Sequence, residues 1–130
     1  MQTWDDYIRL FLHLIAGSIW VGGQIVLAGL VAPLREVAAD APAKAARAYN
    51  RLAWPAYGVL FVTGIWNMLA VPAGALDHMW LGVKILVVLL SGIGALVHQF
   101  ANGNKLMLAV GGAASGLFAI VAMYLGLLVA

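Results

Sequence analysis

The chain has 130 residues, of which 65% are hydrophobic and 9% charged, and its formal net charge is +2 at pH 7. Soluble domains normally carry about a quarter of their residues as Asp, Glu, Lys or Arg, so five acids and seven bases are too few to cover a water-soluble surface of this size. The composition therefore excludes a soluble enzyme, an exposed nucleic-acid-binding protein and a disordered chain.

Four long stretches of the sequence contain no charged residue: 10–34, 52–76, 85–104 and 106–130. About 20 predominantly apolar residues span a bilayer as a helix, and only helices and closed barrels satisfy their backbone groups in lipid. The stretches therefore predict four transmembrane helices at 7–32, 53–72, 79–99 and 106–129. We expect an all-α fold, a single integral-membrane four-helix bundle over residues 1–130 in contact with the lipid bilayer.

The connections between these helices differ in length and charge. The first, from Pro33 to Asn50, is the longest and predicts a short interfacial helix after Pro42. Five bases lie in the first and third connections and at Arg51, which directly precedes the second predicted span, whereas the N-terminus and the second connection carry only Arg9. The positive-inside rule places the basic side in the cytoplasm, so both chain termini are expected on the outer side.

The few polar side chains inside the predicted spans lie at helical spacing. His13, Gly17, Trp20 and Gln24 step by four, three and four residues, and Lys84, Ser91 and His98 fall on one face of the third helix. Thr63 and Asn67 are one turn apart in the second helix. Each of three helices therefore presents a polar stripe, which we expect to face the bundle interior.

Depth in the membrane groups three of these residues. At 1.5 Å per residue, His13 and Lys84 lie roughly 8–9 Å below the outer surface, and Asn67 lies at a similar depth. We therefore predict a polar layer of His13, Asn67 and Lys84, with His78 just above it. His98 is some 20 Å further along its helix and belongs near the first connection.

Each of these residues also has a purely structural interpretation. His13 and His98 can be hydrogen-bonded packing residues, and Lys84 can extend its amine to the interface. The segment from Asp77 to Met79 can be a solvated turn. These alternatives stay open at this point.

Soft donors favour a copper site over a hard-cation site. Neutral imidazole and thioether suit Cu(I), which makes His13, His78 and Met79 the candidate metal ligands. The sequence has no cysteine, no paired carboxylates within the membrane, no HExxH motif and no phosphate-binding loop, so it does not indicate an enzyme of the soluble kind. Small residues at Gly112 and Gly116 predict a close-packing face on the fourth helix, which favours a homo-oligomer.

Several segments resemble the copper resistance protein D (CopD) family of membrane proteins. His13-Leu-Ile-Ala-Gly-Ser-Ile-Trp-Val-Gly-Gly23 is similar to that family's HxxAxxxWxGG opening, and Val62-Thr-Gly-Ile-Trp-Asn67 is similar to its TG-x-x-N pattern. The run that contains Lys84 and the segment that ends at Phe100 resemble its third helix. The resemblance covers about three of the four helices. It implies copper uptake or export across the bacterial inner (cell) membrane, beside a periplasmic copper-binding protein.

A second resemblance is to the HemJ-type protoporphyrinogen oxidases, which are small four-helix membrane proteins that bind b haem. It rests on the His of the first helix and the Lys of the third. The stretch after the first helix departs from that family, because Val31-Ala-Pro-Leu-Arg35 replaces its aromatic Pro-Arg-Leu segment. This resemblance implies haem b held by His13 and a neutral Lys84, with Asn67 in support.

Three hypotheses follow. The first is a copper-handling protein with His13 as ligand, Lys84 and Asn67 as polar support, and His78 with Met79 as the site of first contact. The second is a haem- or porphyrin-binding oxidoreductase built on His13 and Lys84. The third is an accessory subunit of a larger membrane complex, held by the glycine face of the fourth helix.

Overall fold

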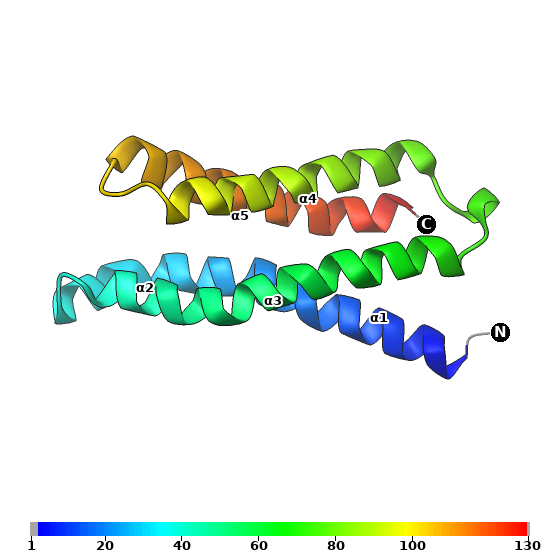
Figure 1. Ribbon diagram of the computed structural model, residues 1–130, viewed down its shortest axis with the longest axis horizontal. Coiled ribbons are helices and arrows are strands. Elements are labelled where there is room, and N and C mark those ends of the chain that lie inside the picture. The colour runs from blue at the N-terminus through cyan, green and yellow to red at the C-terminus, as the bar shows by residue number, and fades with distance from the viewer. Residues whose placement is uncertain (1–2, 130) are drawn as a thin grey trace. The chain divides into compact units, whose positions relative to one another are not determined.

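All regular structure in residues 3–129, the part of the chain that the computed structural model describes, is helical (Figure 1). The elements in chain order are α1 (Trp4–Gly17), the π-helical turn η1 (Ser18–Gly22), α2 (Gly23–Val37), α3 (Ala41–Ala70), the 3₁₀ turn η2 (Ala73–Ala75), α4 (His78–Gln99) and α5 (Lys105–Val129). The prediction of an all-α protein is confirmed.

Four helices are long and apolar enough to cross a membrane, as the hydropathy pattern predicts. They are Trp4–Val37, which joins α1, η1 and α2, together with α3, α4 and α5. The first two have 34 and 30 residues, so they are about 50 Å and 45 Å long at 1.5 Å per residue. Both exceed the hydrocarbon thickness of about 30 Å, and each therefore extends beyond the apolar core of a bilayer.

The first connection is much shorter than the sequence predicts. The first span continues through Pro33 to Val37, and α3 begins at Ala41 and runs to Ala70 without a break. The expected interfacial helix does start at this point, but it is the first part of α3 and not a separate element. Pro42 lies in the first turn of α3, where its missing N–H has no cost, and nothing ends the helix before the apolar segment.

The chain divides into two compact units, residues 1–70 and residues 71–130. Within the described residues, the first is a hairpin of α1–η1–α2 against α3, and the second is a hairpin of α4 against α5 (Figure 1). We call them the first hairpin and the second hairpin. The prediction that they form one bundle over residues 1–130 stays a prediction.

Side-chain caps begin three of the helices. Thr3 and Asp6 form a capping box on α1, in which the Thr3 N–H donates to Asp6 Oδ2 at 2.8 Å. Asp77 Oδ1 accepts from the Trp80 N–H at the start of α4. Asn104 Oδ1 accepts from two backbone N–H groups at the start of α5. These caps satisfy backbone donors that the first turn of a helix leaves unpaired.

Small residues hold the second hairpin together. A Cβ atom added at Gly94 would lie 2.7 Å from the Ser115 backbone nitrogen and 2.9 Å from the Gly111 carbonyl oxygen, so the two backbones are in close contact there. The Ser91 hydroxyl donates to the Ser115 carbonyl at 2.8 Å. Van der Waals packing of this kind is the main force between helices in lipid, and Gly94 is required for it.

Candidate functional site

A hydrogen bond connects His13 to the neighbouring helix of the first hairpin. Its Nδ1 atom lies 2.8 Å from Thr63 Oγ1 on α3, and Thr63 is almost fully buried, with 2% of its surface exposed. The Thr63 hydroxyl also lies 2.7 Å from the carbonyl oxygen of Val59, to which it donates. The sequence places Thr63 and Asn67 on one face, but it does not reveal that Thr63 is the partner of His13.

This arrangement favours one tautomer of the imidazole. A hydroxyl has one hydrogen, and the Val59 carbonyl oxygen at 2.7 Å can accept it from Thr63. When Thr63 donates there, its Oγ1 accepts from His13, and Nδ1 then carries the ring proton. In the neutral ring the lone pair then lies on Nε2, which is the atom that would bind a metal. A hydrogen bond from the other ring nitrogen is the usual way in which proteins orient a metal-binding histidine.

A second polar layer lies one helical turn from this bond. Arg9 precedes His13 by four residues and Asn67 follows Thr63 by four, and because the two helices are antiparallel, both lie on the same side of the His13–Thr63 bond. Arg9 is 6% exposed, and its Nη1 atom is 3.0 Å from Asp6 Oδ1. Within the described residues, Arg9 Nε and Asn67 Oδ1 are buried and make no hydrogen bond. A donor and an acceptor are thus unsatisfied at one level of the hairpin.

Arg9 also belongs to this site, although its position near the N-terminus predicts only a base outside the membrane. It lies four residues before His13 and extends the polar stripe of His13, Gly17 and Trp20. That spacing was the available signal. Burying a guanidinium is costly unless it is paired, and the ion pair with Asp6 offsets that cost.

The π-helical turn η1 lies further along the same helix. It spans Ser18–Gly22, and the Tyr49 hydroxyl on α3 lies 2.7 Å from the Ile19 carbonyl oxygen and 3.0 Å from that of Trp20. The Gln24 side-chain amide donates to the same Trp20 carbonyl. A Cβ atom at Gly23 would collide with the Tyr49 ring. Such turns leave carbonyl groups without regular helical partners and often mark functional sites.

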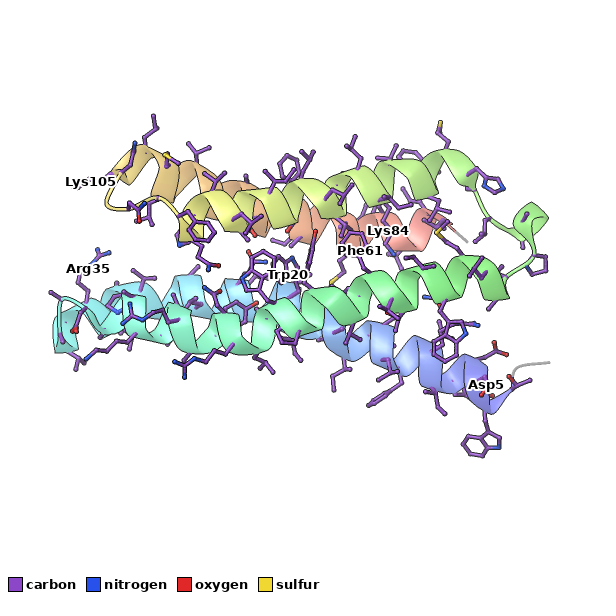
Figure 2. The ribbon with its side chains drawn as sticks, viewed as in Figure 1. Asp5, Trp20, Arg35, Phe61, Lys84 and Lys105 are labelled. Atoms are coloured by element: carbon purple, nitrogen blue, oxygen red, sulfur yellow. The ribbon has the colours of Figure 1, made fainter. Side chains whose placement is uncertain are left out.

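An aromatic cluster packs against this turn. Trp20 is 4% exposed, and its ring centroid lies 4.4 Å from that of Tyr57 and 5.3 Å from that of Trp54. Phe61 continues the cluster at 5.1 Å from Tyr57. Figure 2 shows Trp20 and Phe61 on the same side of the first hairpin. Aromatic contacts of this geometry add about 0.5–1.5 kcal/mol each beyond their buried area, so the cluster stiffens the middle of the hairpin.

The other predicted site residues belong to the second hairpin. Lys84 is partly buried on α4, and its Nζ atom lies beside Gly126 of α5, where an added Cβ would be 3.5 Å from it (Figure 2). His78 is exposed, and its Nε2–H donates to the Ala73 carbonyl at 2.9 Å, which leaves the neutral ring's lone pair on Nδ1. Met79 is 66% exposed. The predicted layer of His13, Asn67 and Lys84 thus draws on both hairpins and stays a prediction.

His98 connects the two helices of the second hairpin. Its Nδ1–H donates to the Leu108 carbonyl at 2.7 Å, and a Cβ at Gly112 would lie 2.9 Å from Nδ1. Gly111 and Ser115 are buried in the same contact. The small residues of α5 therefore serve packing within the hairpin at least in part, and their predicted role in self-association stays a prediction.

In residues 3–129, no group of three or more His, Cys, Asp or Glu side chains is placed to hold a metal ion. A metal held through His13 would therefore also need ligands of other donor types, such as thioethers, carbonyl oxygens or water. Cu(I) accepts soft thioether and imidazole donors, so it is compatible with such a ligand set.

A comparison with known proteins gives an uncharacterized relative. A protein of Aquifex aeolicus (strain VF5) described as "Uncharacterized protein" is 33% identical over 106 residues, which cover 74% of this chain and 69% of the relative. The chain belongs to the same family as this protein. Neither the models of known protein families nor the solved structures give a match. The relative's description assigns no activity, so the function is argued from the site.

Proposed function

We propose that the chain is a copper-handling protein of the bacterial inner membrane, of the copper resistance D type, which binds Cu(I) through His13. The observation that carries the proposal is the His13–Thr63 hydrogen bond of 2.8 Å. It favours the imidazole tautomer with its lone pair on Nε2, and a hydrogen bond to the other ring nitrogen is how proteins usually orient a metal-binding histidine. The resemblance of 13–23 and 62–67 to that family supports the same assignment.

The remaining residues have supporting roles in this proposal. Asn67 and Lys84 supply polar groups beside the copper site, and Met79 and His78 make the first contact with the ion at the start of α4. Met79 is suited to this role because its thioether is exposed and soft. Copper is the cargo here, and a periplasmic copper-binding protein is the proposed donor or acceptor.

The proposal includes an orientation in which both termini lie outside. It is supported by the five bases in or directly beside the first and third connections, against one on the other side. Because the chain has no cysteine, single cysteines report the orientation cleanly. We expect Gly74→Cys to react with an impermeant thiol reagent from outside and Ala43→Cys only after the membrane is permeabilised. The reverse pattern would move His13 to the cytoplasmic half.

The copper assignment is tested on the purified protein with a chromogenic Cu(I) chelator as competitor. His13→Asn places an amide near the position of Nδ1, so it can still donate to Thr63 while it lacks Nε2. We expect His13→Asn to lose Cu(I) binding and to keep its helix content. His98→Asn, which changes a histidine of the second hairpin, should bind Cu(I) as the unmodified protein does. Equal binding by all three proteins would refute a ligand role for His13.

The second candidate is a b-haem protein of the HemJ type, and the same oriented imidazole favours it. A haem iron needs one or two axial ligands from the protein. His13 is suited to this role because its Nδ1 is hydrogen-bonded to Thr63, which orients the ring. The neutral amine of Lys84 is the proposed second ligand, and bound haem would supply redox chemistry. A Soret band in the purified protein that His13→Asn abolishes would select this function over copper. A protein that binds neither ligand would be an accessory subunit.

A further inference from the structure

The end of the first hairpin that carries the N-terminus contains an almost fully buried charged side chain. Arg9 of α1 is 6% exposed, and its Nη1 atom pairs with Asp6 Oδ1 at 3.0 Å. A guanidinium has five N–H donors, and this ion pair engages the group only at Nη1. Arg9 Nε is buried and has no hydrogen-bond partner among residues 3–129. The ion pair therefore balances the charge of Arg9 but leaves a buried donor without an acceptor.

An unpaired acceptor lies at the same level of the neighbouring helix. Asn67 Oδ1 on α3 is buried and likewise has no partner in the described part of the chain. Asn67 lies one helical turn from Thr63, on the side towards the end of α3 at Ala70. Arg9 lies one turn from His13 on the same side, because the two helices are antiparallel. Buried polar groups are generally hydrogen-bonded to protein or to ordered water, so this level of the hairpin indicates a further hydrogen-bonding molecule.

The two atoms define the chemistry of that molecule. It must accept a hydrogen bond from Arg9 Nε–H and donate one to Asn67 Oδ1. It must also be neutral, because Arg9 and Asp6 already balance each other and a further charge inside an apolar span is costly. A carboxylate or a phosphate would add a charge and has no hydrogen for Asn67, and a metal ion is repelled by the guanidinium. Water meets all three requirements and needs the least space.

We propose that this level of the first hairpin binds water, which accepts a hydrogen bond from Arg9 Nε–H and donates one to Asn67 Oδ1. Polar residues connect the site to the end of the hairpin, because Asp6 lies nearer the start of α1 and its side chain is more exposed than that of Arg9. The bound water lies one turn from His13 and hydrates the approach to its imidazole from this end. The proposal holds whether or not the chain binds copper or haem.

Nuclear magnetic resonance of the full chain labelled with ¹⁵N-arginine, in a deuterated detergent without hydroxyl groups, tests this proposal. The chain has four arginines, so the Nε signal of Arg9 is the one that remains in Arg35→Lys, Arg47→Lys and Arg51→Lys alike. We expect a rotating-frame cross-peak between Arg9 Hε and water with the sign of a direct dipolar contact. The exposed Arg35 should show the opposite sign, which arises from proton exchange with bulk water. Absence of the dipolar cross-peak at Arg9 would overturn the proposal.

Variants at Asn67 test the second partner of the water. Asn67→Leu has a similar size and removes the polar group, so the cross-peak between Arg9 and water should be lost. Asn67→Ser keeps an oxygen that accepts a hydrogen bond and should retain the cross-peak. Met68→Leu is the matched control, because it changes the next residue, which is 38% exposed, and it should have no effect. Circular dichroism verifies the helix content of each variant, and Asn67→Met replaces Asn67→Leu if that variant does not fold. A cross-peak of full intensity in Asn67→Leu, or an equal loss in Met68→Leu, would contradict the proposed site.

Discussion

The two hairpins achieve helix association in different ways. In the first, larger polar and aromatic side chains connect the helices: His13 to Thr63, Tyr49 to the carbonyl groups of η1, and Trp20 within its aromatic cluster. In the second, the helices approach through small residues such as Gly94, with only short polar contacts. Lipid provides no hydrophobic force between helices, so helices in a membrane associate through close packing and through hydrogen bonds between side chains. The second hairpin relies mainly on the first kind of contact, and the first hairpin uses the second kind as well.

The difference separates a candidate site from a scaffold. The first hairpin contains the π-helical turn, a buried guanidinium and two unsatisfied polar atoms. Each of these features costs stability, and proteins retain such costs mainly at functional positions. The second hairpin leaves one buried hydroxyl, Ser115 Oγ, without a partner, and otherwise packs regularly. The proposed ligand His13 therefore lies in the hairpin with more of these costly features, whereas the contact between α4 and α5 is mainly one of close packing.

The largest expected effect is on packing in the second hairpin. Gly94→Ala places a Cβ 2.7 Å from the backbone nitrogen of Ser115, so the helices must separate. We expect a loss of about 3 kcal/mol in the free energy of unfolding, measured by denaturation in micelles. Gly82→Ala is the control, because a Cβ there meets nothing within 4 Å. A helical Gly→Ala change at such a position should be neutral or stabilise by up to about 1 kcal/mol. Equal effects of the two changes would show that the second hairpin does not depend on close backbone packing at Gly94.

The next effect concerns ligand binding in the first hairpin. Thr63→Val keeps the side-chain shape but removes the oxygen that accepts from His13 Nδ1. Loss of such a supporting bond typically lowers metal affinity about 10- to 100-fold, and we expect the Cu(I) affinity to fall by that factor in chelator competition. Thr63→Ser retains the oxygen and should restore most of the affinity. Unchanged binding in Thr63→Val would show that the hydrogen bond does not orient the ligand.

A smaller effect is expected at the π-helical turn. Tyr49→Phe removes the hydroxyl that donates to the carbonyl groups of Ile19 and Trp20. The expected loss is about 1 kcal/mol in the free energy of unfolding, the usual net value of one hydrogen bond. Tyr124→Phe, on the exposed surface of α5, is the matched control and should have no effect. If both variants behave alike, the turn does not depend on Tyr49.

The sequence predicts the helices better than the site. Hydropathy and charge locate all four spans, because a bilayer sets their length and composition. The polar stripe of the first helix predicts that His13 faces a neighbouring helix, and the structure gives it Thr63 as a partner. The sequence predicts a short interfacial helix after Pro42, but nothing in its charged composition indicates that this helix continues without a break into the apolar span as α3.

Other features depend on contacts between helices that no local pattern encodes. Nothing in the sequence of Ser18–Gly22 distinguishes a π-helical turn from a regular helix, and its contact with the Tyr49 hydroxyl of α3 is seen only in the folded chain. The burial of Arg9 depends in the same way on its neighbours in the folded chain. The spacing of residues within one helix therefore predicts the polar stripes. The partner of each polar residue lies on another helix and is known only from the structure.

The central claim is that His13 presents Nε2 as a ligand while Thr63 accepts a hydrogen bond from Nδ1–H. Nuclear magnetic resonance of the protein labelled with ¹⁵N-histidine tests this claim most directly. We predict that His13 shows a protonated Nδ1 and an unprotonated Nε2, and that Cu(I) shifts the Nε2 resonance of His13 while that of His98 stays in place. His13→Asn identifies the signal by its loss. A proton on Nε2 of His13, or a His13 spectrum that Cu(I) leaves unchanged, would contradict the account.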